Sequence, residues 1–262
     1  MRSLFVLTAF LLSLCMIGCD DNSTNSSATG MLRVEGFDSP PPVDVDSIWL
    51  HVLRVEAHSS ADGWVTLSEP DTVFDFLELT NGVTAVLADT TVVPAGDYQQ
   101  MRLVLSDSNN IFIDGAWHPL IVPSGTQSGV KINLNFTVEP DELVEIMIDF
   151  DAGHSINWTP NDYKLKPVFH AFKKTLSEAI SGTVTDTLGV GIEDAMVTAF
   201  DGSDSTSTLT DTAGNYTLIL PSGTYTLEAS AAGYTMSDTT YTSVVVDPDD
   251  LILLTDFDFV LQ

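Results

Sequence analysis

Cysteine is nearly absent from this sequence: it occurs twice, as Cys15 and Cys19, within the first 19 residues. The rest of the chain therefore cannot form a disulfide or a zinc site built on paired cysteines. A His-Glu-x-x-His motif is also lacking, and the histidines are scattered along the sequence (His51, His58, His118, His154 and His170). These absences argue against a zinc enzyme.

Basic residues are also scarce. Lys and Arg together number 9 against 37 acidic residues, which gives a formal net charge of −28, and none occurs after Lys174. The negative electrostatic field of such a protein repels nucleic-acid phosphates and anionic lipid headgroups. We therefore expect no nucleic-acid partner and no membrane contact through a basic surface.

Long apolar runs are missing after residue 18, but the N-terminus contains one. Arg2 precedes an apolar stretch from Leu4 to Ile17, which is typical of a secretory signal and too short to span a bilayer. The stretch ends in Met16-Ile17-Gly18-Cys19, which resembles the lipobox of bacterial lipoprotein precursors. The resemblance implies a signal peptide over residues 1–18 and a diacylglycerol and palmitate anchor on Cys19. Apart from this anchor and the calcium considered below, we expect no cofactor.

The segment behind Cys19, through Thr29, is polar and predicts a flexible, disordered tether. Lipid anchoring implies an extracytoplasmic protein at the cell membrane or the outer membrane. Asp20 resembles an inner-membrane retention signal of enterobacteria, whereas other phyla interpret this position differently, so both membranes stay open.

The remaining sequence has little helical periodicity, and Val73–Leu79 is its most helical segment. Alternating apolar residues predict antiparallel strands at Val130–Val138 and Val144–Phe150. The short connection through Pro140-Asp141 predicts that these two strands form a hairpin. Asp149 is expected to face outward. Further strands are expected at Met31–Phe37, Ile48–Ala57, Tyr98–Leu105, Ile111–Asp114 and Tyr163–Phe172. The fold class is therefore all-β, with two β-sandwich domains behind the signal and tether.

The second module is expected over residues 177–262. Its turn signals are Asp211–Gly214 and Pro221-Ser222-Gly223, both interpreted as hairpin turns, and inward positions follow at Tyr216, Leu218, Tyr225 and Leu227. The ordered pattern from Ile180-Ser-Gly182 to Gly233-Tyr234 resembles the carboxypeptidase-regulatory-like domain. The resemblance implies a Greek-key, transthyretin-like (prealbumin-like) sandwich without catalytic residues.

The first module is expected over residues 30–174. It contains Asp38-Ser39-Pro40, Asn81-Gly82, Ala95-Gly96-Asp97-Tyr98, Asp149-Phe150-Asp151 and Leu165-Lys166-Pro167-Val168. Together these resemble domain of unknown function 4382, a family found in bacterial lipoproteins, often ahead of a carboxypeptidase-regulatory-like module. The resemblance implies no particular activity.

A Pro-x-Gly-x-Tyr spacing occurs once in each module, at Pro94–Tyr98 and at Pro221–Tyr225. One hypothesis is that the modules are related Greek-key sandwiches in which the two tyrosines are equivalent. The alternative is chance recurrence of a common turn.

One polar constellation carries candidate chemistry. Asp149 and Asp151 lie two apart on a predicted strand, so both side chains point the same way, and His154 follows. The set suggests a calcium site at Asp149 and Asp151, or a hydrolase that uses the two carboxylates and His154. Carboxylates that cap a turn at a strand end are the alternative. Gly153-His154-Ser155 also lacks the second glycine of a nucleophile elbow.

We therefore expect a membrane-anchored, extracytoplasmic and non-catalytic binding or scaffolding module at the cell envelope. Its partner would be a glycan or a protein at the cell surface. Trp117 and Trp158, both in predicted loops, are the candidate ligand contacts. The competing hypotheses are the hydrolase, the calcium-binding protein and a purely mechanical role for the second module.

Overall fold

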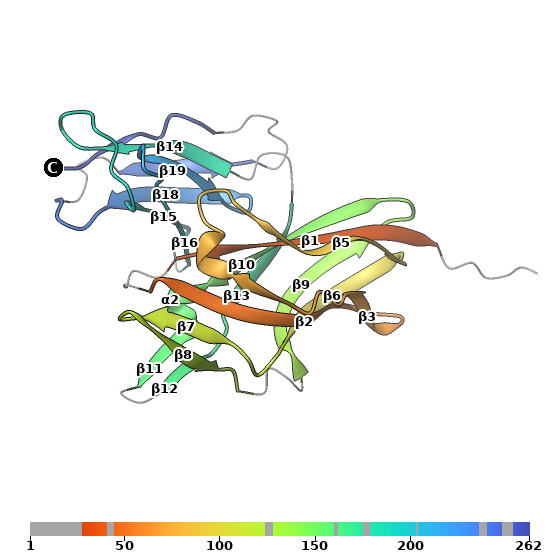
Figure 1. The fold of residues 1–262 in the computed structure, drawn as a ribbon. Helices are drawn as coiled ribbons and strands as arrows, with labels where there is room; N and C mark the ends of the chain where they lie inside the picture. Colours follow the sequence, from red (N-terminus) through yellow and green to blue (C-terminus); the bar gives the residue numbers. More distant parts are fainter. Residues whose placement is uncertain are drawn as a thin grey trace, which may run out of the picture.

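The computed structural model describes residues 28–40, 45–123, 128–159, 162–174, 179–202, 204–235, 240–247 and 254–262. The signal segment, Cys19 and most of the tether lie outside these residues. The described chain is almost entirely β-structure, apart from the short 3-10 helix η1 (Phe76–Glu78) and the helix α2 (Ala152–Ser155), and is folded into two bodies (Figure 1). The all-β, two-sandwich prediction is confirmed.

Two sheets enclose the core of the first module. The smaller sheet has the order β13-β10-β1-β5, made of β1 (Thr29–Ser39), β5 (Ala85–Pro94), β10 (Leu143–Asp151) and β13 (Phe169–Lys173). The larger sheet has the order β11-β12-β8-β7-β2-β6-β9, and β3 and β4 also pair with β2. Its strands are β2 (Ser47–Ser59), β3 (Gly63–Ser68), β4 (Thr72–Asp75), β6 (Gly96–Leu105), β7 (Asn110–Ile113), β8 (Ala116–Ile121), β9 (Val130–Val138), β11 (Ile156–Thr159) and β12 (Asp162–Leu165).

Alternating side chains form this core. Leu32 and Val34 of β1 and Ile48 and Leu50 of β2 are fully buried, whereas Trp49, between the last two, faces solvent. This period of two is what a sheet with one covered face requires.

The second module has a three-stranded sheet in the order β17-β14-β20 and a four-stranded sheet in the order β16-β15-β18-β19. Its strands are β14 (Ala179–Thr185), β15 (Met196–Phe200), β16 (Ser205–Leu209), β17 (Asn215–Ile219), β18 (Gly223–Ser230), β19 (Tyr241–Val246) and β20 (Phe259–Val260). Apolar residues from both sheets, among them Tyr216, Leu218 and Leu227, form a separate core. Each module therefore has its own hydrophobic interior.

The two modules share one strand order. In the first, β1 lies between antiparallel β5 and parallel β10, and in the second, β14 lies between antiparallel β17 and parallel β20. Likewise, β6 pairs with β2 and β9, as β18 pairs with β15 and β19. The hairpin β7–β8 and the pair β11–β12 are additions to the larger sheet of the first module.

The repeated Pro-x-Gly-x-Tyr motif occupies the same place in both modules. Each copy carries the chain from the smaller sheet to the larger one, from β5 to β6 and from β17 to β18. The hydroxyl of Tyr98 donates to the carbonyl of Pro94, and that of Tyr225 donates to the carbonyl of Pro221, both at 2.8 Å. The hypothesis that the two tyrosines are equivalent is confirmed.

Several local predictions were wrong. The strands Val130–Val138 and Val144–Phe150 do not form a hairpin, because β9 pairs with β6 while β10 pairs with β1 and β13. The segments Asp211–Gly214 and Pro221–Gly223 connect different sheets and are not hairpin turns either. Tyr163–Phe172 is divided into β12 and β13 around Pro167, which has no amide hydrogen for a ladder. Val73–Leu79 is helical only in η1.

Candidate functional site

The turn Thr80-Asn81-Gly82 of the first module lies against strands β16 and β17 of the second. Asn81 has a positive φ of 54°. Its backbone amide donates to Thr208 Oγ1 at 2.7 Å, and its side-chain oxygen accepts from the Thr217 amide at 2.7 Å. Its side-chain nitrogen donates to the carbonyl of Asn215 at 3.3 Å. One residue thus bridges the edge strands of both sheets of the second module.

A second set of contacts lies where β1 and β10 end. Ser39 Oγ donates to Asp149 Oδ2 at 3.1 Å and accepts from the Ser207 amide at 3.3 Å. Thr206 Oγ1 donates to the same Asp149 oxygen at 3.4 Å. Since β1 and β10 are parallel, their C-terminal ends meet, and Ser39 and Asp149 reach β16 together.

This junction buries two carboxylates. Burial raises the pKa of Asp149 to about 7, with a further contribution from the charge of Asp151. Burial also raises the pKa of Asp38 well above its ordinary range, assisted by the charges of Asp149 and Asp151. The Ala152 amide favours the charged form of Asp38, yet neither carboxylate oxygen has a partner within hydrogen-bond limits among the described residues.

The expectation that Asp149 faces outward to solvent was wrong. Its side chain is on the outer face of β10, as the alternation predicts, but the second module covers that face and leaves the residue 2% exposed. The sequence pattern of one strand identifies a face without revealing what packs on it.

Asp151 and His154 form a local cap. Asp151 Oδ1 accepts from the His154 amide at 3.0 Å, and Asp151 Oδ2 lies 2.7 Å from His154 Nδ1. Ser155 is fully buried, and its hydroxyl accepts from the Val168 amide at 2.8 Å. Asp151 therefore caps a turn at the end of its strand, which is the alternative to a calcium or catalytic role. The helix that it caps, α2, leads the chain from β10 to β11.

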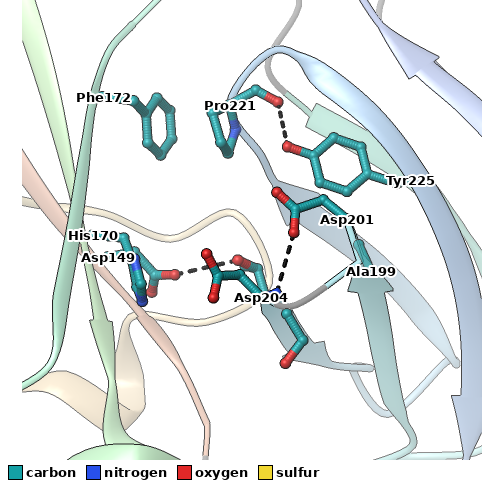
Figure 2. A pocket seen from close by; sticks show the side chains of 10 residues that line it. Asp149, His170, Phe172, Ala199, Asp201, Asp204, Pro221 and Tyr225 are labelled. Atoms are coloured by element: carbon teal, nitrogen blue, oxygen red, sulfur yellow. Dashed lines mark hydrogen bonds between the residues drawn. The ribbon is translucent and has the colours of Figure 1, made fainter.

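Two cavities adjoin β16 at the junction of the modules. One, of about 110 Å³, is lined by Asp149, His170 and residues of the second module (Figure 2). The other, of about 230 Å³, is lined by Asp151, His154 and Ser207. Asp149 and His154, which the sequence grouped together, thus line different cavities. Among the described residues, no group of three or more His, Cys, Asp or Glu is placed to hold a metal ion, and calcium binding stays a prediction.

An exposed aromatic cluster occupies the outer face of the larger sheet. The rings of Trp49 and Trp117 lie 4.2 Å apart between centroids, and Phe112 lies 5.1 Å from Trp117. Trp49 and Trp117 are 40% and 45% exposed. Trp49 Nε1 donates to Asp75 Oδ2 at 3.1 Å, and Asp75 also accepts from the Ser47 hydroxyl. We call Trp49, Phe112 and Trp117 the aromatic face.

The two predicted tryptophan contacts lie on strands and not in loops. Trp117 is the second residue of β8, and Trp158 belongs to β11, where its side chain lies outside the described residues. The sequence interpretation missed Trp49, although its position between the apolar residues Ile48 and Leu50 is the alternation that places a side chain on the outer face.

The described part of the chain contains no helix long and apolar enough to cross a membrane. The family model described as domain of unknown function (DUF4382) matches residues 29–167, more than half of the chain. The model of the carboxypeptidase regulatory-like domain matches residues 179–262. No curated protein matches this sequence.

The chain is also similar to several solved structures. The Bacillus anthracis TIE protein is 11% identical with a TM-score of 0.28, and the alignment covers 89% of this chain and 34% of that one. The shaft pilin spaA of Lactobacillus rhamnosus GG (D295N mutant) is 9% identical with a TM-score of 0.27, covering 89% and 97%. The minor pilin GBS52 of Streptococcus agalactiae is 10% identical with a TM-score of 0.26, covering 90% and 97%. The chain thus spans about a third of the TIE protein.

Proposed function

Because this chain belongs to the family of domain of unknown function 4382 and continues into a carboxypeptidase regulatory-like domain, we propose that it is a non-catalytic binding or scaffolding module. The module works at the cell envelope on the extracytoplasmic side, anchored through lipid on Cys19. Its ligand is a glycan, which binds at the aromatic face.

The observation that carries this proposal is the exposed contact between Trp49 and Trp117. Large exposed rings in contact with one another are uncommon on a soluble surface and mark interaction sites. The hydrogen bond from Trp49 Nε1 to Asp75 fixes one ring before any ligand arrives, which lowers the entropic cost of binding.

The surroundings of the rings favour a neutral glycan over other partners. Sugar rings present flat apolar C–H faces that stack on indoles and hydroxyl groups that bond to polar side chains. Asn110, which pairs with Trp49 in the sheet, supplies such a polar group. The net charge of −28 disfavours anionic partners.

The test is affinity electrophoresis and glycan-array binding with neutral polysaccharides. We expect Trp49→Ala and Trp117→Ala each to weaken binding by about fivefold or more, since each removes a central ring contact worth more than about 1 kcal/mol. Trp64→Ala, which removes an indole stacked on Arg102 away from this face, is the matched control. Unchanged binding by the double variant Trp49→Ala/Trp117→Ala would refute the assignment of this face.

The anchor is tested separately by palmitate labelling of cells that express the full chain. We expect label on the wild-type protein and none on Cys19→Ser, because the thiol of Cys19 is the acylated group. Two or more acyl chains give stable anchoring where one gives only marginal binding, so we also expect the variant to leave the membrane fraction. Equal labelling of both proteins would rule out this anchor.

A further inference from the structure

The junction between the modules contains a chemically labile dipeptide. Asn81-Gly82 is the only Asn-Gly pair in the sequence, and its turn bonds to β16 and β17. In such a pair the backbone nitrogen of the glycine can attack the side-chain amide carbon of the asparagine, because glycine has no side chain to hinder the approach. The attack releases ammonia and closes a five-membered succinimide ring.

The packing of the two modules requires the glycine of this pair. Gly82 has a φ of 77°, in the left-handed region that other residues adopt only at a cost. A Cβ atom at this position would also lie 3.0 Å from the Thr217 side chain of β17. The residue that makes Asn81 reactive is therefore one that the junction cannot exchange without strain.

The packed junction also restrains the asparagine. Its Oδ1 accepts from the Thr217 amide at 2.7 Å, and its Nδ2 donates to the Asn215 carbonyl at 3.3 Å. Both bonds hold the side chain of Asn81 on β17. The side chain must leave these partners before its amide carbon can swing onto the Gly82 nitrogen. The reaction is therefore slow while the turn is packed on β17 and proceeds after the turn has left it.

The product of the reaction no longer fits the junction. Water opens the succinimide ring to aspartate or isoaspartate, so that one water is consumed and one ammonia is released. Aspartate has an oxygen in place of the donor nitrogen of Asn81, so two acceptors would face each other at Asn215. Isoaspartate adds one methylene group to the main chain and displaces the amide that bonds to Thr208 Oγ1. Both products add a negative charge to a chain of net charge −28.

From this geometry we propose that Asn81 is a deamidation site gated by the module junction. Asn81 stays intact while its turn is packed on β17, and it deamidates when the modules separate. The modified turn cannot form its bonds again, so a transient opening becomes a permanent one. Deamidation thereby sets a limited lifetime for the coupled state of the two modules. This inference does not depend on the proposed glycan site.

The test is peptide mass spectrometry of the complete mature chain during incubation at neutral pH and constant temperature. Electron-transfer fragmentation locates the modified residue and distinguishes aspartate from isoaspartate. The same chain unfolded in urea gives the reference rate. We expect Asn81 to deamidate about thirtyfold more slowly in the folded protein, because two side-chain hydrogen bonds of ordinary strength must break first.

Variants elsewhere in the junction test the gating without altering Asn81. Ser39→Ala removes the hydroxyl that accepts a bond from β16, and it should accelerate deamidation by about fivefold. Thr206→Val removes the hydroxyl that donates to Asp149 while keeping a similar side-chain shape, and it replaces Ser39→Ala if that variant does not fold. Ser108→Ala, at an exposed residue outside the junction, is the matched control and should leave the rate unchanged.

Three results would overturn the proposal. They are equal rates in the folded and the unfolded chain, a reaction no faster in Ser39→Ala or Thr206→Val than in Ser108→Ala, and an unmodified Asn81 even in urea. Asn81→Asp tests the consequence of the reaction, and we expect calorimetry to show its second module melting separately from the first. A melting profile identical to that of the wild type would mean that deamidation leaves the junction closed, and would refute the permanent opening.

Discussion

At the scale of single residues, the acidic side chains at the module junction behave differently from the many on the surface. An exposed carboxylate on this protein is solvated and charged, whereas Asp149 and Asp38 are buried. Burial disfavours their charged forms, and the charge of Asp151 adds to the effect for both, as does that of Asp149 for Asp38. The junction of the two modules is therefore sensitive to protons.

The consequence is a stability that falls as the pH rises. Asp149 retains its proton in the folded protein up to about pH 7, whereas in the unfolded chain an aspartate loses it near 3.8. The folded state thus binds more protons in this window, and each increase in pH lowers the free energy of unfolding. The full difference corresponds to at most about 4 kcal/mol. Burial of Asp38 also makes the free energy of unfolding fall as the pH rises. The other titratable groups around Asp149 are Asp151, His170 and Asp204.

Thermal melts between pH 5 and pH 8 test this prediction. We expect the melting temperature of the wild type to fall across the window and that of Asp149→Asn, which mimics the protonated form, to fall several degrees less. Asp107→Asn, an exposed residue elsewhere, should follow the wild type. Parallel curves for Asp149→Asn and the wild type would contradict the role of this carboxylate.

At the scale of strands and turns, the sequence predicts where strands lie better than how they pair. The alternation at Val130–Val138 and Val144–Phe150 identifies β9 and β10 correctly. Their short connection suggests a hairpin, because neighbouring strands usually pair. The parallel partner of β10 is instead β1, more than a hundred residues earlier, and no local pattern reveals such a contact.

The repeated turn shows what a local motif does predict. Pro-x-Gly-x-Tyr fixes a corner in which the tyrosine is buried and its hydroxyl bonds to a carbonyl four residues earlier, and both copies have this geometry. The information is contained within five residues, so the sequence could predict it. The candidate site could not be predicted as a whole, since Asp149 meets Thr206 only when two modules pack together.

At the scale of the whole molecule, the function of the junction is to hold two independent cores in one orientation. Each module has its own hydrophobic interior, and hydrogen bonds at Asn81, Ser39 and Asp149 join described residues of the two modules. Asn81 contributes three of the hydrogen bonds across the junction. Its turn also lies across the edge strands β16 and β17, whose unpaired edges would otherwise be open to other chains.

Replacing Asn81 with glycine isolates this contribution. Glycine adopts a φ of 54° without strain, so the backbone bond to Thr208 is retained while both side-chain bonds are lost. The Thr217 amide would lose its acceptor, at a cost of about 1–3 kcal/mol. We expect calorimetry to show the second module melting earlier and separating from the first. Asp114→Gly, also at a positive φ but in a turn outside the junction, is the control. Identical transitions in both variants would mean that the modules are held in place by other contacts, with Ser39 and Asp149 as the next pair to test.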